Sequence, residues 1–172
     1  MNMLSIEKCE VIPNSLVASF LEKGYADSYR TEVDGHISIK DYVYKFYTSP
    51  LFKLERFILT WTVRKPSTDM QAKEVSEGNT NKFAAWTLED RRENELLMRD
   101  MADRTRSWFM VNHLGTRENP ITQLYFGTGI SPSPRRKNEK SSIGFFFIAM
   151  LPFHKIYSVL LLYFAKKQLI QT

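Results

Sequence analysis

The stretch from Phe83 to Ile130 constrains the fold more than any other part of this sequence. Its apolar residues alternate with polar ones in four segments, FAAWTLED, ELLMRDM, TRSWFMVNHL and ITQLYFGTGI. Alternation of this kind is typical of half-buried β-strands. The connections EDRREN, ADR and GTRENP are too short for a crossover helix, so each strand must turn back beside the previous one. The sequence therefore predicts a continuous antiparallel meander.

The chain before the meander predicts one strand and two helices. Residues 25–34, YADSYRTEVD, alternate and end at the turn signal Asp34-Gly35. Ser38 and Asp41 form an approximate capping pattern before apolar residues at helical spacing, and a second helix begins at Pro50. Residues 65–82 lack apolar periodicity and predict a long exposed loop.

We expect a single domain preceded by a short extension. Residues 1–24 are the extension, with a short helix that Asn14 caps and Gly24 ends, and residues 25–172 form the domain. A chain of 172 residues can bury roughly 70% of its unfolded surface. The one cysteine, Cys9, excludes an internal disulfide framework and is compatible with a reducing compartment. The first residues lack the long apolar run of a secretory signal, so a cytoplasmic location is expected.

The C-terminal stretch predicts a strand followed by a helix. Ile143 to Leu151 is a compact apolar run, and Pro152 suits the first turn of a helix better than a strand interior. Beyond the proline, one broad helical face is apolar and Ser158, Ala165 and Lys166 fall opposite it. The apolar face comprises Phe153, Ile156, Tyr157, Val159, Leu160, Tyr163 and Phe164. The predicted fold class is α+β, with a curved antiparallel sheet packed around this long terminal helix.

A transmembrane span is the competing interpretation of this stretch, because residues 144–165 have about the length that crosses a bilayer. Pro152 and Lys155 stand in its middle, where a charge is expensive, so a soluble amphipathic helix is favoured. A helix resting on a membrane remains an alternative, since Lys155, Lys166 and Lys167 could face anionic headgroups. We expect no transmembrane segment and at most weak contact with a membrane surface.

No motif for catalysis, metal binding or a cofactor stands out. His36, His113 and His154 are scattered along the chain, and no nucleophile or Walker sequence occurs. Gly127-Thr-Gly129 lacks the third glycine of a dinucleotide turn and is better explained by a bend in a strand. Much of the net charge of +5 lies in residues 135–140, RRKNEK, which predict a solvated loop rather than a nucleic-acid or lipid patch.

A cluster of opposite charges lies between two predicted strands of the meander. It comprises Arg99, Asp100, Asp103, Arg104 and Arg106. An inward carboxylate there would bind a polar group or serve as an acid or base, which makes Asp100 a possible polar group of a pocket. A hairpin turn with solvated ion pairs is the favoured interpretation.

Large apolar side chains suggest where a ligand pocket would lie. Period-two counting can place five of them on one sheet face, beneath two from the terminal helix. These are Trp86, Met98, Trp108, Met110 and Phe126 from the strands, and Ile156 and Leu160 from the helix. Ordinary core packing is the alternative, because such side chains usually fill space.

Several stretches resemble a bacterial domain-of-unknown-function family, DUF2867, of the START-like or Bet v 1-like superfamily. They are Ala26-Asp27-Ser28-Tyr29, Trp108 to Val111, Leu124-Tyr125-Phe126 and, above all, Leu151-Pro152-Phe153-His154-Lys155-Ile156. The resemblance implies a helix-grip fold and, at superfamily level only, the binding of apolar ligands. The family has no assigned activity, and a fold does not supply a function.

The leading hypothesis is a soluble, non-catalytic protein that binds a small hydrophobic molecule between the sheet and the terminal helix. One alternative is an enzyme of cyclase or hydrolase type on the same scaffold, with Asp100 or Asp103 as the acid or base. Another is a peripheral membrane or protein-interaction module that uses the basic loop and the terminal helix. The sequence leaves the oligomeric state open.

Overall fold

A computed structural model describes residues 6–62, 64–131 and 145–171, without the side chains of Lys23 and residues 145–154. The described chain has seven strands and five helices, and it is α+β as expected. The strands are β1 (Glu7–Cys9), β2 (Tyr25–Asp34), β3 (Lys82–Phe83), β4 (Trp86–Arg91), β5 (Glu95–Asp100), β6 (Thr105–Gly115) and β7 (Pro120–Ile130). The helices are α1 (Ser19–Lys23), α2 (Ile39–Tyr47), α3 (Pro50–Thr62), α4 (Asp69–Glu77) and α5 (Phe145–Ile170).

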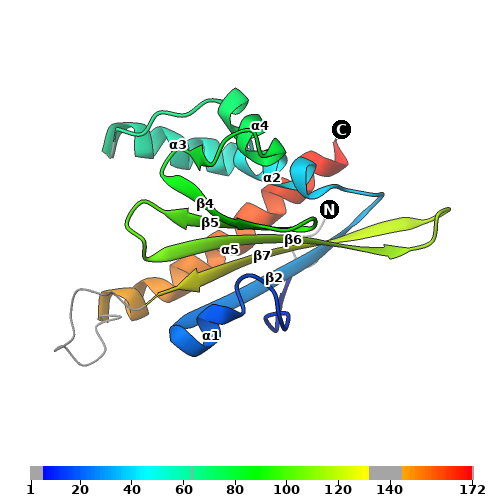
Figure 1. Ribbon diagram of the computed structural model, residues 1–172, viewed down its shortest axis with the longest axis horizontal. Coiled ribbons are helices and arrows are strands. Elements are labelled where there is room, and N and C mark those ends of the chain that lie inside the picture. Colours follow the sequence, from blue (N-terminus) through cyan, green and yellow to red (C-terminus); the bar gives the residue numbers. More distant parts are fainter. Residues whose placement is uncertain (1–5, 63, 132–144, 172) are drawn as a thin grey trace.

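All seven strands form one antiparallel sheet in the order β1-β2-β7-β6-β5-β4-β3 (Figure 1). Strands β4 to β7 are the predicted meander, since each pairs with the next along the chain. The predicted first strand, β2, pairs with β7 along its whole length, from Tyr25 opposite Ile130 to Asp34 opposite Ile121. The N-terminal extension adds the unpredicted edge strand β1, which places Cys9 opposite Ser28.

The two helices expected after β2 are present as α2 and α3, and α2 begins where Ser38 accepts a hydrogen bond from the Asp41 amide at 3.1 Å. The prediction of an exposed loop at residues 65–82 is wrong, because this segment contains helix α4. Thr68 and Gln71 form a capping box at the start of α4, and Gly78 ends it in the left-handed conformation. These local signals stabilise a short helix that its apolar pattern alone does not reveal.

The N-terminal helix begins later than expected. Gly24 ends α1 as predicted, but Asn14 does not cap it, because the helix runs from Ser19 and Ala18 is the N-cap residue. Asn14 has a left-handed backbone with φ 61°. The amide of Leu16 donates instead to the Glu95 carboxylate at 2.8 Å, a long-range contact that local propensity cannot anticipate.

The predicted strand at Ile143 to Leu151 and the break at Pro152 are wrong. Helix α5 runs without interruption from Phe145 through Pro152 to Ile170, while residues 143 and 144 lie outside the described chain. A short apolar run fits a buried strand and a buried helix equally well by periodicity. A proline inside a helix forgoes one backbone hydrogen bond, a cost that tertiary packing can offset.

The face that α5 buries also differs from the expected one. Among its described side chains, the buried ones are Ser158, Leu161, Leu162, Ala165 and Lys166, and the wheel puts three of these, Ser158, Ala165 and Lys166, on the polar face. Small side chains at Ser158 and Ala165 allow close approach, and Lys166 Nζ donates to Thr31 Oγ1 at 3.0 Å. Ile156, from the expected apolar face, is 60% exposed.

The sheet has two covered faces. The face that packs against α2 and α5 is called the inner face here, and its core includes Tyr29, Met98, Phe109 and Phe126. The opposite, outer face carries a smaller core with Trp108 at its centre, covered by α1 and the turn before it. Figure 1 shows α2, α3 and α4 gathered on one side of the sheet and α1 on the other. Among the described residues, no helix has the length and apolar character needed to cross a membrane.

Candidate functional site

The predicted pocket residues do not share one face of the sheet. Trp86, Met98 and Phe126 contribute to the inner core, whereas Trp108 and Met110 belong to the outer core. The register explains the division, because Trp108 lies opposite Gly127 and Phe126 lies opposite Phe109. Placing all five on one face was wrong, since a change of one residue in turn length exchanges the two faces of a strand.

The two residues expected from the terminal helix do not face the core. Ile156 is exposed and Leu160 is half-buried, while the neighbouring Leu161 and Leu162 pack into the inner core. The layer between the sheet and α5 is therefore lined by a different set of helix residues from the one predicted.

Aromatic rings fill the inner layer beneath α2. Phe46 lies with its ring centroid 4.7 Å from that of Phe109 and 4.8 Å from that of Phe126. Tyr47 continues the cluster, with its ring centroid 4.8 Å from that of Phe52. This part of the layer is a close-packed core, so a ligand would have to lie farther along α5.

Three hydroxyl groups in this layer are buried without a hydrogen-bond partner among the described residues. They belong to Tyr29 on β2, Tyr47 on α2 and Ser158 on α5. Burial and the nearby Asp27 carboxylate raise the pKa of Tyr29 to about 12. Burial also raises the pKa of Tyr47. Both phenols are therefore neutral groups that can donate a hydrogen bond.

A carboxylate and a phenol join α3 to α5 beside this layer. The Tyr157 hydroxyl donates a hydrogen bond to Glu55 Oε2. Burial raises the pKa of Glu55, although the Tyr157 hydrogen bond opposes the shift. The pKa of Tyr157 is raised by burial and by the Glu55 charge. Electrostatic interactions are stronger in such a site than in water.

A second carboxylate, Asp27, is buried on the same face of the sheet near the start of β2. It is 2% exposed and accepts hydrogen bonds from the Tyr25 hydroxyl at 2.9 Å and the Thr128 amide at 3.2 Å. Figure 1 shows the first half of α5 running toward this end of the sheet, where β2 begins and β7 ends. Asp27 thus adds a buried, hydrogen-bonded carboxylate to this end of the inner face.

The acidic residues proposed for catalysis instead hold a hairpin turn. Asp100 Oδ1 accepts from the Arg104 amide at 2.8 Å, and Oδ2 accepts from Thr105 Oγ1 at 2.9 Å. Asp103 forms an ion pair with Arg106 at 2.6 Å. Asp100 does lie opposite Trp86 on neighbouring strands, but its two oxygens already serve the turn. The favoured interpretation, a hairpin with ion pairs, agrees with these contacts.

The histidines form one contact that their sequence positions did not suggest. The rings of His36 and His113 are stacked with centroids 3.8 Å apart. Burial and the neighbouring His36 lower the pKa of His113. The His154 side chain and the basic loop at residues 135–140 lie outside the described residues. Within the described chain, no group of three metal-ligating side chains is assembled.

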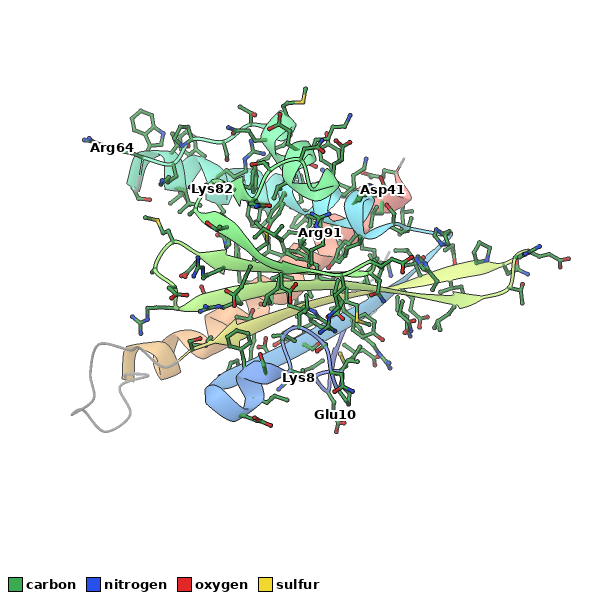
Figure 2. All side chains as sticks on the ribbon, in the orientation of Figure 1. Lys8, Glu10, Asp41, Arg64, Lys82 and Arg91 are labelled. Atoms are coloured by element: carbon green, nitrogen blue, oxygen red, sulfur yellow. The ribbon has the colours of Figure 1, made fainter. Side chains whose placement is uncertain are left out.

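An open groove of about 560 Å³ lies outside the predicted location. It is formed by β1, α1 and the start of β2, and its lining includes Cys9, Val11 and Leu21. Lys8 and Glu10, which also line it, lie on the side of the sheet away from α2, α3 and α4 (Figure 2). Burial raises the pKa of the Cys9 thiol, whose Sγ donates to Ser28 Oγ at 3.3 Å. This thiol is therefore not activated as a nucleophile.

Sequence reasoning missed the polar groups of the inner layer. Asp27 stands two residues from both Tyr25 and Tyr29 on β2, so the three side chains point to the same face of the sheet. A β2 strand with Tyr29 facing the core therefore also directs the Asp27 carboxylate toward the core. Glu55 and Ser158 carry no comparable local signal, because the packing of α3 and α5 decides which way they face.

The comparisons with known proteins add no relative to this description. No family model, curated protein or solved structure matches the chain.

Proposed function

We propose that the protein binds a small, mainly hydrophobic molecule with a polar head, without catalysis, between the inner face of the sheet and α5. The observation that carries the proposal is that the buried hydroxyls of Tyr29 and Ser158 have no hydrogen-bond partner among the described residues. Ligand sites typically combine apolar walls with a few well-placed polar groups. The aromatic layer and these hydroxyls together have that composition.

The energetic argument concerns the state without ligand. A buried hydroxyl that makes no hydrogen bond costs about 1–3 kcal/mol, so most buried polar groups in proteins are paired. A ligand with a hydroxyl or carboxyl head would supply a partner. The neutral Tyr29 phenol can donate to such a head, and Asp27 or Glu55 can accept from a hydroxyl.

The expected helix-grip arrangement forms part of the same proposal. The packing of α5 on β2 and β7 supports this arrangement, because α5 would enclose a ligand that lies between the helix and these two strands. We do not extend the proposal to an enzyme, since Asp100 and Asp103 are engaged in their hairpin turn.

Tryptophan fluorescence offers a direct test. Of the three tryptophans, Trp86 belongs to the inner core, Trp108 lies in the outer core and Trp61 is exposed. Titration with hexadecanol and palmitate should change the Trp86 emission with a dissociation constant in the micromolar range, corresponding to about −8 kcal/mol. The melting temperature should rise as well, because ligand binding stabilises the native state.

Matched variants make the test specific. Trp86→Phe should abolish the fluorescence change, whereas Trp108→Phe should retain it. Tyr29→Phe should weaken the binding of hexadecanol about tenfold, because it removes one hydrogen bond to the ligand. A folded protein that shows neither a fluorescence change nor a higher melting temperature with these ligands would contradict the proposal.

A further inference from the structure

Helix α3 presents an apolar stripe to solvent. Its members are Leu54, Phe57, Ile58 and Trp61, which are between 50% and 74% exposed. Their spacing places them on one face of the helix, and Phe57 and Trp61 touch with ring centroids 6.2 Å apart. A soluble helix usually buries such a stripe, so this face is the unusual one.

The opposite side of α3 is fixed to the domain and keeps the stripe outward. Arg56 is buried and donates to Asp69 at 2.6 Å, to the Ser67 carbonyl at 2.6 Å and to Ser67 Oγ at 2.9 Å. Phe52 packs into the inner core, and Glu55 bonds to Tyr157 on α5. Rotating α3 to bury the stripe would break these contacts.

The charges around the stripe are positive. Glu55 is the single acidic residue between positions 50 and 65, and it is half-buried and bonded to Tyr157. Arg64 and Lys65, just beyond α3, are exposed. Figure 2 shows Arg64 extending away from the body of the domain at this end. The stripe therefore ends in an aromatic side chain, Trp61, followed by two cations.

We propose that the α3 stripe docks on an anionic lipid surface. The apolar side chains would enter the boundary between headgroups and acyl chains, as in interfacial amphipathic helices. Trp61 would lie at headgroup level, which tryptophan favours, and Arg64 and Lys65 would contact anionic headgroups. A second copy of the chain offers poorer complementarity, because its own stripe carries the same positive charges.

This docking surface is independent of the proposed ligand site. The stripe is on the solvent side of α3, whereas the hydroxyls that lack a partner within the described chain lie in the inner layer. Loss of vesicle binding and loss of ligand binding can therefore be measured separately, with different variants.

Vesicle co-sedimentation tests the proposal. The protein should bind vesicles that contain phosphatidylserine more tightly than vesicles of phosphatidylcholine alone, and binding should weaken as salt is added. Replacing Phe57 and Trp61 together by serine should reduce binding at least tenfold, because their insertion buries apolar area. Arg64→Gln should reduce binding to the anionic vesicles about fivefold and leave binding to neutral vesicles unchanged.

A pair of leucines provides the matched control. Leu54, in the stripe, is 55% exposed, and Leu21, on α1, is 53% exposed. Leu54→Ser should weaken vesicle binding, whereas Leu21→Ser should not. The proposal would be wrong if Leu54→Ser and Leu21→Ser bound the vesicles equally well, or if the wild type did not bind them. A dimer detected by sedimentation without vesicles, and lost in Leu54→Ser, would assign the stripe to a second copy and would also overturn it.

Discussion

The two faces of the sheet treat their buried polar groups differently. On the outer face, the Glu95 carboxylate is 6% exposed and accepts hydrogen bonds from the Leu16 amide and from Trp108 Nε1, both at 2.8 Å. Arg92 forms an ion pair with it at 3.2 Å. On the inner face, the hydroxyls of Tyr29, Tyr47 and Ser158 have no partner within the described chain.

The difference separates a structural role from a candidate binding role. The Glu95 contacts attach the N-terminal turn to the sheet, although one hydroxyl of this turn, Ser15 Oγ, is also buried without a partner among the described residues. The inner hydroxyls add no internal hydrogen bond and cost stability while they remain unpaired. Removing a hydrogen-bonded group such as the Glu95 carboxylate should therefore lower the free energy of unfolding, whereas removing an inner hydroxyl without a partner should leave it unchanged or raise it.

The largest effect is expected from Glu95→Ala. The change leaves the Leu16 amide and Trp108 Nε1 without their acceptor, and removing one partner of a buried charged network costs about 3 kcal/mol. Urea denaturation followed by tryptophan fluorescence measures the loss. Glu93→Ala, at an exposed position two residues away, should change stability by less than about 0.5 kcal/mol. Equal effects of the two substitutions would contradict the role given to Glu95.

Gly127→Ala should be the next most damaging, again through the outer face. A β-carbon at this position would lie 2.6 Å from the Asp27 carbonyl oxygen and 2.8 Å from Trp108 Cε3. Forcing a strand and a buried indole apart costs about 2 kcal/mol. The denaturation midpoint should fall without a change in the slope of the transition. An unchanged midpoint would show that the outer core has room there.

Two tyrosines of α2 give a matched test of the inner face. The Tyr42 hydroxyl donates to the Tyr125 carbonyl at 3.1 Å, whereas the Tyr47 hydroxyl is unpartnered among the described residues. Tyr42→Phe should lower the free energy of unfolding by about 1 kcal/mol, and Tyr47→Phe should leave it equal or raise it by up to about 1 kcal/mol. Losses of the same size would mean that Tyr47 is not an unsatisfied group.

The smallest effect is a pH dependence on the inner face. The pKa of Glu55 in the folded protein is raised above its ordinary value of 4.5, chiefly by burial. The folded state then holds this proton more tightly, so the contribution of Glu55 to stability is full below pH 4.5 and is lost as the pH rises through the raised pKa. The free energy of unfolding of Glu55→Gln, relative to that of the wild type, should therefore increase from pH 4 to pH 7. Urea denaturation of both proteins at pH 4 and at pH 7 measures this difference. A difference in stability that is the same at both pH values would contradict the raised pKa of Glu55.

The strands were predictable because their signals are local. The alternating residues of β2 and the short turns of the meander define strands and antiparallel neighbours without knowledge of the tertiary structure. The face of each strand was less predictable, because turn register decides whether Trp108 shares a side with Phe126. The helix α4 has a local signal that was overlooked, the Thr68 and Gln71 capping box.

The candidate site was mostly beyond reach of the sequence. The helical wheel of α5 predicted the wrong face, because Ser158 and Lys166 face inward while Ile156 faces solvent. The unpartnered hydroxyls depend on three elements meeting in space. The sequence cannot show that a hydroxyl lacks a hydrogen-bond partner, because this depends on which side chains surround it in the folded structure.

The long interval between β2 and β7 affects how the chain assembles during synthesis. Strand β2 has β1, of three residues, on one side and β7 on the other, and β7 begins at Pro120. Most of the β2 edge must therefore wait until β7 leaves the ribosome, and α5 emerges later still. Unpaired edges and uncovered apolar faces favour aggregation in partly folded chains. We expect nascent chains stalled before Pro120 to be held by chaperones, and chains that include α5 to be released.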